Sequence, residues 1–278
     1  MKVDLHSHSY YSDGVYSPSE VIELANQVKC DLFSLTDHDT TVGVLEAQER
    51  ADDLSLNFIP GVEISAFWQN MTIHILGIGV NVDNDILQKG LRRNQELRKE
   101  RAEKIAHGLR RTGIKDVLEK TRALSKTNMI TRTHFAQMLI QEGYCKDMKS
   151  VFRRFLTGKK PGASRVEWAN FEEVIGWIHS AGGLAVLAHP FRYRMTQTKI
   201  KKMLSDYKGA LGDGIEVVTG TSTEEEVNLA SRWASDFNLL ISSGSDYHGW
   251  PNQRVNIGSL KEVPNSDNLI WNHLLWQK

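Results

Sequence analysis

The sequence predicts an α/β fold in which short strands form a barrel that is interrupted by a helical insertion. Short apolar segments alternate with amphipathic helical ones, which is the pattern of a parallel sheet with crossover helices. The alternation stops near residue 85 and resumes near residue 169. We therefore expect a barrel built from residues 1–85 and 169–278, with residues 86–168 as a helical insertion.

The first strand and the first helix are clearly marked. Residues 3–5 form a short apolar segment. Ser17 is suited to be an N-cap, Pro18 fills the first helical position, and Glu20 completes a capping box. Apolar residues then recur at helical spacing across residues 21–28. These signals predict a strand followed by an amphipathic helix.

The next three strands are expected at residues 32–35, 58–62 and 72–76. The last two lie too close together for a long crossover helix between them. The insertion contains charged stretches with helical character, such as residues 92–111, and a segment rich in Lys and Gly at residues 158–162. We expect the insertion to contain helices and no strand.

Helix signals mark the return of the barrel pattern after the insertion. Asn170 is expected to cap a helix through Glu173, and Gly182 and Gly183 to end it. Ser222 is expected to open a later helix. Three further strands are expected at residues 184–188, 215–218 and 239–242, which brings the total to seven.

The composition excludes several classes of protein. The 34 basic and 34 acidic residues balance, and the pI is about 7.2, so no general positive field marks a nucleic-acid coat protein. Cys30 and Cys145 lack the spacing of a metal motif or a disulfide framework. No apolar run approaches the roughly 20 residues of a membrane span, and the first residues do not resemble a signal peptide. We expect a soluble cytoplasmic protein with no membrane contact and no obligate protein partner.

Chemically active side chains follow the predicted strands. In parallel barrels the loops after the strands open on one face, so residues in these loops are brought together. The His-x-His pattern of the first loop puts both rings on one side of an extended backbone. Six histidines and three acids form this set, and all but His74, which lies within its strand, are at or just after strand ends: His6, His8, Asp13, His38, Glu63, His74, His189, Asp246 and His248.

Imidazoles mixed with carboxylates, without thiolates, suit borderline to hard divalent ions. Nine ligands are too many for one ion, but they suffice for two or three ions that share carboxylates, the arrangement used for displacement at phosphorus. Manganese is preferred, with zinc, iron and magnesium as alternatives. Such a centre lowers the pKa of bound water towards about 7, so a metal-bound hydroxide would be the nucleophile.

These residues resemble the polymerase and histidinol phosphatase (PHP) superfamily. The resemblance implies a distorted (β/α)7 barrel with a centre of two or three metals. It is carried by motifs that span nearly the whole chain: residues 4–8 with Asp13-Gly14, residues 36–39, residues 61–63, His74, residues 188–190 and residues 244–248.

The resemblance implies a role for each residue of the set. His6, His8, Glu63 and Asp246 would hold the first metal; Asp13, His38 and His248 the second; Glu63, His74 and His189 the third. Asp37 is interpreted as a carboxylate that orients an imidazole. Asp37, His189 and Arg192 are the catalytic candidates. Glu216 is interpreted as a polar residue of the barrel interior, with the orientation of a metal ligand as the alternative.

Within the superfamily, residues 132–136, Lys160-Pro161, residues 189–193 and residues 214–218 resemble the nucleoside 3',5'-bisphosphate phosphatase and RNase AM group. This implies removal of a phosphate from a nucleotide, or 5'-3' exonuclease action on short RNA. The insertion would then be a substrate-binding cap. Arginine binds phosphate through the paired N–H groups of its guanidinium, and lysine binds it through the charge of its ammonium group. Five residues are expected to bind phosphate here: Arg132, His134, Lys160, Arg165 and Arg192.

Two other functions stay open at this point. A histidinol-phosphate phosphatase, or another small-molecule phosphatase, would use the same barrel and metals, but the long basic insertion favours a larger and more anionic substrate. A non-catalytic PHP module that binds proteins is disfavoured because all nine ligand positions are filled.

Overall fold

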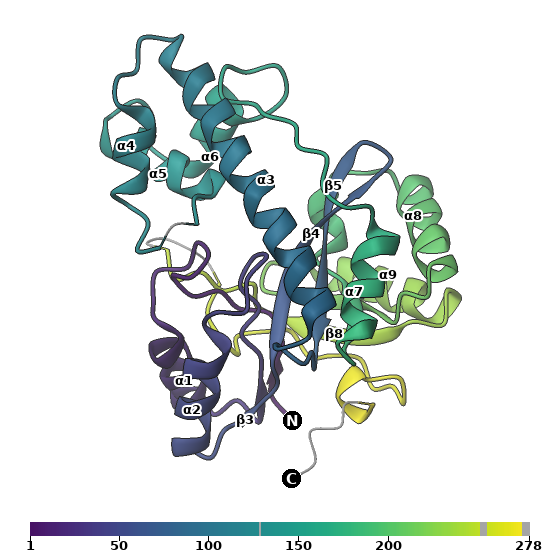
Figure 1. Cartoon of the computed structure of the whole chain (residues 1–278). Coiled ribbons are helices and arrows are strands. Elements are labelled where there is room, and N and C mark those ends of the chain that lie inside the picture. The colour runs from purple at the N-terminus through teal and green to yellow at the C-terminus, as the bar shows by residue number, and fades with distance from the viewer. Residues whose placement is uncertain (128, 251–254, 274–278) are drawn as a thin grey trace.

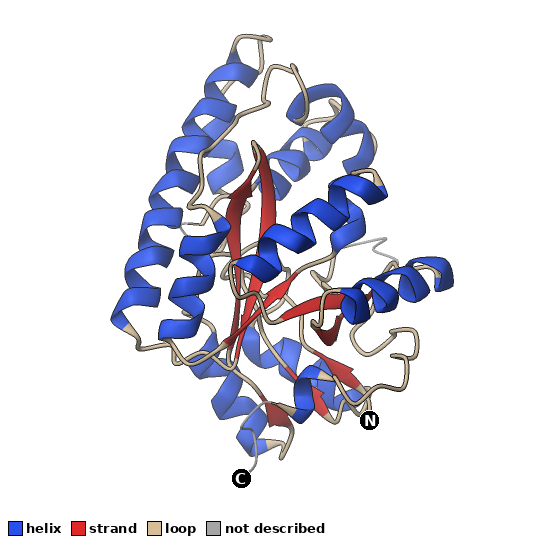
Figure 2. Ribbon diagram, turned by 90° about the vertical axis from the view of Figure 1, so that its right-hand side faces the viewer, coloured by secondary structure: helices blue, strands red, loops and turns tan. Residues whose placement is uncertain are grey.

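The structure is a computed structural model that describes residues 1–127, 129–250 and 255–273. Helices surround two sheets (Figures 1 and 2). The smaller sheet consists of three short parallel strands, β1 (Val3–Asp4), β2 (Leu32–Phe33) and β3 (Asn57–Phe58). The larger sheet has the order β4 (Gly61–Trp68), β5 (Met71–Ile78), β6 (Leu184–Leu187), β7 (Gly214–Thr219) and β8 (Leu240–Gly244).

The prediction of one strand over residues 58–62 was wrong. This segment contributes to both sheets: β3 pairs with β2, and β4 starts at Gly61 and pairs with β5. Pro60 lies between them and has no N–H for a strand ladder. β5 runs antiparallel to both β4 and β6. The hairpin turns at Gln69 and Asn70, which have φ angles of 43° and 65°, as a tight two-residue turn requires.

The helix signals were largely confirmed. Ser17 caps α1 (Pro18–Gln27) with a complete capping box, and Asn170 caps α7 (Phe171–Ser180) in the same way. The predicted N-cap at Ser222 lies one residue before the observed one, which is Thr223 at the start of α9 (Glu224–Asp236). The other helices are α2 (Val44–Asp53), α3 (Asp85–Arg110), α4 (Val117–Arg122), α5 (Arg132–Gln141), α6 (Met148–Val151), α8 (Gln197–Gly209), and the short turns η1 (Phe152–Leu156), η2 (Pro190–Tyr193) and η3 (Ile270–Asn272).

None of the helices in the described part of the chain has both the length and the apolar surface that crossing a bilayer would require.

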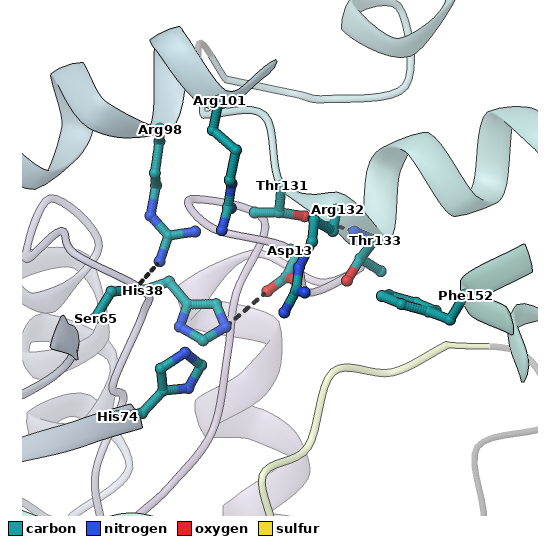
Figure 3. Close-up of a pocket in the computed structure, with 10 residues that line it drawn as sticks. All are labelled: Asp13, His38, Ser65, His74, Arg98, Arg101, Thr131, Arg132, Thr133 and Phe152. Carbon is teal, nitrogen blue, oxygen red and sulfur yellow. Dashed lines mark hydrogen bonds and ion pairs between the residues drawn. The ribbon is translucent and has the colours of Figure 1, made fainter. Parts of the chain in front are cut away.

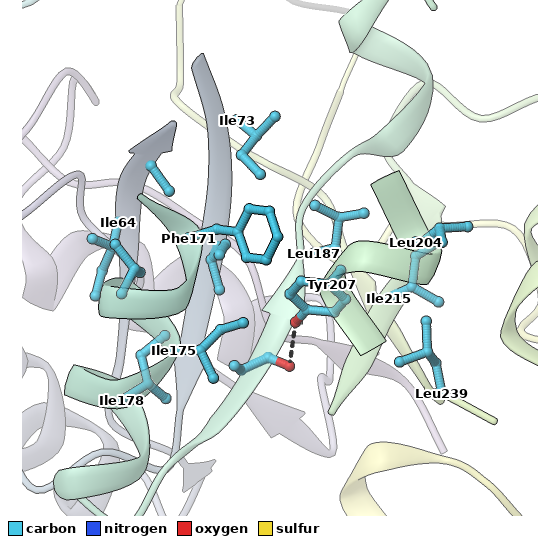
Figure 4. Packing of buried hydrophobic residues seen from close by; sticks show 14 of the residues in the cluster. Ile64, Ile73, Phe171, Ile175, Ile178, Leu187, Leu204, Tyr207, Ile215 and Leu239 are labelled. Carbon is cyan, nitrogen blue, oxygen red and sulfur yellow. Dashed lines mark hydrogen bonds between the residues drawn. The ribbon is translucent and has the colours of Figure 1, made fainter. Parts of the chain in front are cut away.

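Two of the apolar cores include residues of α3, one at the start of this helix and the other at its end. The larger core packs α7, α8 and α9 against the five-stranded sheet (Figure 4), and within it the Tyr207 hydroxyl donates to the Ala185 carbonyl at 2.7 Å. The smaller core is formed by residues of α3 to η1 alone, between Ala102 and Leu156. α3 therefore belongs to both: it packs against α7 at its start and joins the smaller core at its end.

Backbone hydrogen bonds join the two sheets near the ends of their strands. On one side the Leu5 amide donates to the Ser243 carbonyl at 2.9 Å, and the Asp246 amide donates to the His6 carbonyl at 2.8 Å. On the other side the Glu63 amide donates to the Thr36 carbonyl at 3.1 Å. The expected mixed α/β class is confirmed. The described strands number eight instead of seven, and the loops after the parallel strands converge at one place.

Candidate metal centre

The nine predicted ligand residues all lie at this convergence of loops. Nitrogen and oxygen atoms of eight of them, all but His189, form three groups, and within each group the atoms lie within 4.8 Å of one another. His8, His38 and Glu63 each belong to two groups, so the three groups form one continuous centre. The groups are His6, His8, Glu63 and Asp246; His8, Asp13, His38 and His248; and His38, Glu63 and His74.

Glu63 is the hub of the centre. It is the third residue of β4, not a residue after a strand as the sequence suggested. His74 on the antiparallel strand β5 lies diagonally across from it on the same face. Glu63 Oε1 lies 2.8 Å from His74 Nδ1 and 2.9 Å from His189 Nε2. Glu63 Oε2 lies 2.7 Å from His38 Nδ1 and 3.3 Å from His8 Nε2.

The other two carboxylates hold the remaining imidazoles. Asp246 Oδ1 lies 3.0 Å from His8 Nε2 and 3.3 Å from His6 Nε2. Asp13 Oδ1 lies 3.3 Å from His248 Nε2. The rings of His8 and His248 stack with their centroids 4.1 Å apart. Side chains from the loops after β1 and β8 thus enclose one side of the centre.

Several buried nitrogen and oxygen atoms of the centre lie close to one another, yet make no hydrogen bond of good geometry among the described residues. They include Asp13 Oδ1, Glu63 Oε2 and His38 Nδ1. Buried polar atoms nearly always have a hydrogen-bond partner, and the binding of an ion is one of the regular explanations when they do not. Lone pairs of nitrogen and oxygen that converge without donors between them are what a divalent cation needs. The residues present therefore fit a metal centre.

The imidazoles and carboxylates perturb each other's ionisation. Burial opposes the charged form of Glu63, but the neighbouring rings of His38, His74 and His6 hold its pKa well below the ordinary value. Burial likewise opposes the charged form of His8, yet the carboxylates of Asp246 and Glu63 raise its pKa to about 9. Burial lowers the pKa of His38 to about 4. In the absence of metal, protons on some rings thus compensate the carboxylate charges.

Asp37 lies beneath the centre and supports the first loop. Its carboxylate accepts hydrogen bonds from the Ser9 amide at 2.8 Å and from the hydroxyls of Ser9 and Ser12 at 2.6 Å. Ser12 Oγ is 3.3 Å from His8 Nδ1. The carboxylate therefore reaches the imidazole through a hydroxyl, instead of contacting it directly.

Two further residues act at the edge of the centre. Arg192, in the 3₁₀ turn η2, makes an ion pair with Asp246 Oδ2. Glu216, in β7, contacts His6 and the backbone of His189. The sequence interpretation placed Glu216 in the barrel interior with the orientation of a ligand as the alternative, but it did not identify these two partners.

A pocket opens over the centre, and three arginines line it (Figure 3). Asp13, His38 and His74 form one side, while Arg98 and Arg101 reach in from α3 and Arg132 from the start of α5. The sequence interpretation identified Arg132 and missed the other two. Their only sequence signal is that they lie on the charged helix of the insertion.

Arg98 is paired, whereas the other two guanidinium groups are not. Arg98 Nε donates to Asp39 Oδ2 at 2.6 Å, and Arg98 Nη2 donates to Ser65 Oγ at 2.8 Å. Within the described ranges, the side chains of Arg101 and Arg132 have no hydrogen bond or ion pair. Arg101 is only 8 % exposed and lies over the Trp168 ring at 5.1 Å, and burial next to Arg98 and Arg132 lowers its pKa well below the ordinary value.

A buried cation without a partner is costly to the folded protein. Arg101 is such a cation, and Arg132 lies beside it in the same pocket with its guanidinium 5.7 Å from the centre of the Phe152 ring. An anion in the pocket would pair with both. The pocket therefore combines candidate metal ligands on one side with available positive charge on the other.

The remaining predicted phosphate-binding residues lie outside the pocket lining. His134 is buried, and its Nδ1 accepts from the Thr131 amide at 3.1 Å, which caps α5. Lys160 and Arg165 are exposed on the segment that leads from η1 back to α7.

Three comparisons with known proteins agree with this geometry. The sequence profile of the PHP domain matches residues 4–220. The 3',5'-nucleoside bisphosphate phosphatase of Chromobacterium violaceum is 39% identical over 273 residues, 98% of this chain and 96% of the relative. A 5'-3' exoribonuclease of Haemophilus influenzae is 35% identical over 273 residues, 97% of this chain and 98% of the relative. A solved amidohydrolase structure from Chromobacterium violaceum, with sulfate bound and no metal, has a TM-score of 0.94 at 39% identity and covers 98% of this chain and 95% of that one.

Proposed function

This chain belongs to the PHP domain family, and on that premise we propose that it is a hydrolase that uses divalent metal ions to cleave phosphate esters of nucleotides. Its substrates are nucleoside 3',5'-bisphosphates, short 5'-phosphorylated RNAs cleaved from the 5' end, or both, as the names of the two relatives suggest. One observation carries the proposal: the unpaired guanidinium of Arg101 faces the same pocket as the candidate metal ligands His38, His74 and Asp13.

We propose that the centre holds two or three ions, manganese by preference. His6, His8, Glu63 and Asp246 would hold the first ion, and Asp13, His38 and His248 the second. A third would be held by Glu63, His74 and His189. In support, His189 Nε2 lies 2.9 Å from Glu63 Oε1, and His38 lies within reach of this third group as well. When bound, the ions would supply an activated water and would neutralise charge on the phosphoryl oxygens.

The chain's own residues bind and orient the substrate. Arg101 and Arg132 receive a second phosphate, one that is not being cleaved, and in doing so fix the scissile phosphate over the centre. Phe152 forms the apolar end of the pocket. Arg192 holds Asp246 in place through its ion pair. Lys160 and Arg165 stay candidates for longer substrates, since both are exposed and positively charged.

The architecture supports the same proposal at a larger scale. We propose that the two sheets form one distorted barrel, in which β3 and β4 count as one interrupted strand of seven, because bridges between Ser7 and Tyr247 and between His38 and Glu63 connect the edges of the sheets. Residues 86–168 would form a cap on this barrel, with residues 1–85 and 169–278 as its two parts. The separate apolar core between Ala102 and Leu156 supports this division.

The proposal is tested by a comparison of three substrates. The manganese-loaded protein is incubated with a nucleoside 3',5'-bisphosphate, a 5'-phosphorylated short RNA and histidinol phosphate, and kcat/KM is measured for each. We expect turnover of one or both nucleotides to exceed that of histidinol phosphate, which has no second phosphate for the arginines to bind. Preference for histidinol phosphate would contradict the assignment, and so would undiminished turnover in excess chelator.

A further inference from the structure

We infer that Glu216 positions two ligands of the metal centre at once, by fixing the ring of His6 and the backbone of His189. The inference rests on the metal centre proposed above and adds to it a residue that none of the three ligand groups contains. Glu216 is buried, with 1% of its surface exposed, and lies in β7 among apolar neighbours.

The side chain of Glu216 contacts both residues directly. Glu216 Oε1 accepts a hydrogen bond from His6 Nδ1 at 2.9 Å, and Glu216 Oε2 accepts one from the His189 amide at 2.6 Å. The register of β7 against β8 shifts between Glu216 and Val218, which marks a bulge or irregularity in the ladder. Such irregularities often redirect a side chain towards a site.

The contact with His6 determines which ring nitrogen faces the centre. When Nδ1 carries the proton and donates it to Glu216, Nε2 keeps its lone pair for a cation. His6 Nε2 lies 3.3 Å from Asp246 Oδ1 and 3.4 Å from Glu63 Oε2, the two carboxylates of its group. The carboxylate thus selects the form of His6 that can bind metal.

The contact with His189 stabilises an unfavourable backbone conformation. His189 has a φ of 28° and a ψ of 61°, a strained region that residues with a side chain rarely adopt. The hydrogen bond from its amide to Glu216 anchors this conformation. In it the ring reaches Glu63, with Nε2 at 2.9 Å from Oε1.

The neighbouring strand leaves room for this arrangement. A Cβ atom on Gly244 of β8 would lie 2.2 Å from the Cβ of His6 and 2.9 Å from Glu216 Oε1. Glycine at this position lets His6 and Glu216 meet. The rings of His6 and His189 stack with their centroids 5.7 Å apart, they belong with different proposed ions, and one carboxylate connects them.

The test replaces Glu216 by glutamine, which has nearly the same shape. The amide has one acceptor oxygen for two donors, so either His6 takes the wrong tautomer or the His189 amide loses its partner. We expect Glu216→Gln to weaken manganese binding by about 10- to 100-fold, the usual effect of losing such a carboxylate. Affinity is measured by titration of the stripped protein against a competing chelator, a readout that needs no turnover.

Asp4→Asn is the matched control. Asp4 is also a fully buried carboxylate; it accepts from the amides of Ser245 at 2.7 Å and Gly258 at 3.0 Å and interacts with the backbone of His6, but it has no ion pair or hydrogen bond with an imidazole in the described part of the chain. We expect it to lower the thermal midpoint of the protein while its manganese affinity stays that of the wild type. Equal losses of affinity in both variants would overturn the inference, because the effect would then be one of folding alone.

A second readout records the tautomer itself. In the zinc-loaded wild type, the His6 Nδ1 proton should exchange slowly and give its own resonance in a spectrum of ¹⁵N-histidine-labelled protein. Glu216→Gln should remove this resonance and Asp4→Asn should keep it. Persistence of the resonance in the glutamine variant would overturn the inference.

If the glutamine variant does not fold, Glu216→Asp is used in its place. The aspartate carboxylate is set back by one methylene from the position of the glutamate carboxylate, and the same loss of manganese affinity is expected. A wild type that binds metal but hydrolyses no nucleotide would refute the proposed function and leave this test intact.

Discussion

Arg101 is the residue whose charge has the clearest functional consequence. It is buried and unpaired in the described part of the chain, and it lies beside Arg132 in the pocket. We predict that Arg101→Met loses about 10- to 100-fold in kcat/KM for a nucleoside 3',5'-bisphosphate, equivalent to about 1.4–2.7 kcal/mol. Methionine keeps an aliphatic chain against Trp168 and removes the charge. Turnover of p-nitrophenyl phosphate, which has no second phosphate, should barely change.

Lys104→Met provides the control for this prediction. Lys104 is on the same helix, 60 % exposed and 3.8 Å from Glu100, so its loss should leave both substrates unaffected. Equal losses on both substrates for Arg101→Met would show that the arginine supports the fold or the metals. No loss on either would mean that the pocket does not bind the second phosphate.

At this scale the sequence predicted the ligands better than the substrate pocket. The candidate ligands follow strands or lie on them, so their clustering follows from the topology of the fold. Arg98 and Arg101 lie on a helix with many charged residues, and helical spacing does not tell which of these face a pocket formed with α5. The partners of Glu216 could not be predicted, because they depend on the local register of β7, which no local pattern reveals.

At the scale of elements, α3 connects the two cores, and its contact with α7 is tight. A Cβ atom on Gly90 would lie 2.4 Å from the ring of Trp177, whereas one on Gly176 of α7 would meet nothing within 4 Å. We predict that Gly90→Ala lowers the free energy of unfolding by about 1–3 kcal/mol through overpacking. Gly176→Ala should raise it by about 0.5–1 kcal/mol, because alanine favours an exposed helical position.

Urea denaturation of the two variants measures these opposite signs directly. The same substitution in two helices separates helix propensity from packing. If both variants were stabilised, α3 would not lie against α7 as closely as described. If both were destabilised, the surface of α7 at Gly176 would be covered by another part of the chain.

Elements with local signals were predictable, and elements defined by pairing were not. The capping boxes at Ser17 and Asn170 are local, so the starts of α1 and α7 were correct. The hairpin of β4 and β5 was missed because its alternate faces are both largely buried, which hides the period of two. β1, β2 and β3 have two residues each, and their bounds depend on neighbours far along the chain.

At the scale of the whole molecule, metal binding should depend on pH. Burial opposes protonation of His8, but Asp246 and Glu63 raise its pKa to about 9, so the metal-free protein carries this proton at neutral pH. A metal must displace it, and affinity should therefore fall as pH decreases below 9, by about tenfold per unit for each proton released. Calorimetry at pH 7 in buffers of different ionisation enthalpy measures the release, and binding without proton release would contradict this account.

The balanced net charge of the chain conceals a strong local asymmetry. The 34 basic and 34 acidic residues exclude a general attraction for nucleic acids, and the pocket shows how an anion can still be bound: carboxylates gather for metals while arginines gather opposite them. This asymmetry could not be predicted from the sequence, because Arg98, Arg101 and Arg132 come from two helices joined by a long connection.

The central claim is that several metal ions act together on a nucleotide phosphate, and a metal titration tests it most directly. The protein is stripped with chelator, manganese is added in measured equivalents, and hydrolysis of a nucleoside 3',5'-bisphosphate is followed together with bound metal. Three connected ligand groups predict that activity reaches its maximum only at two to three bound ions per chain. Full activity at one equivalent or fewer would contradict the account.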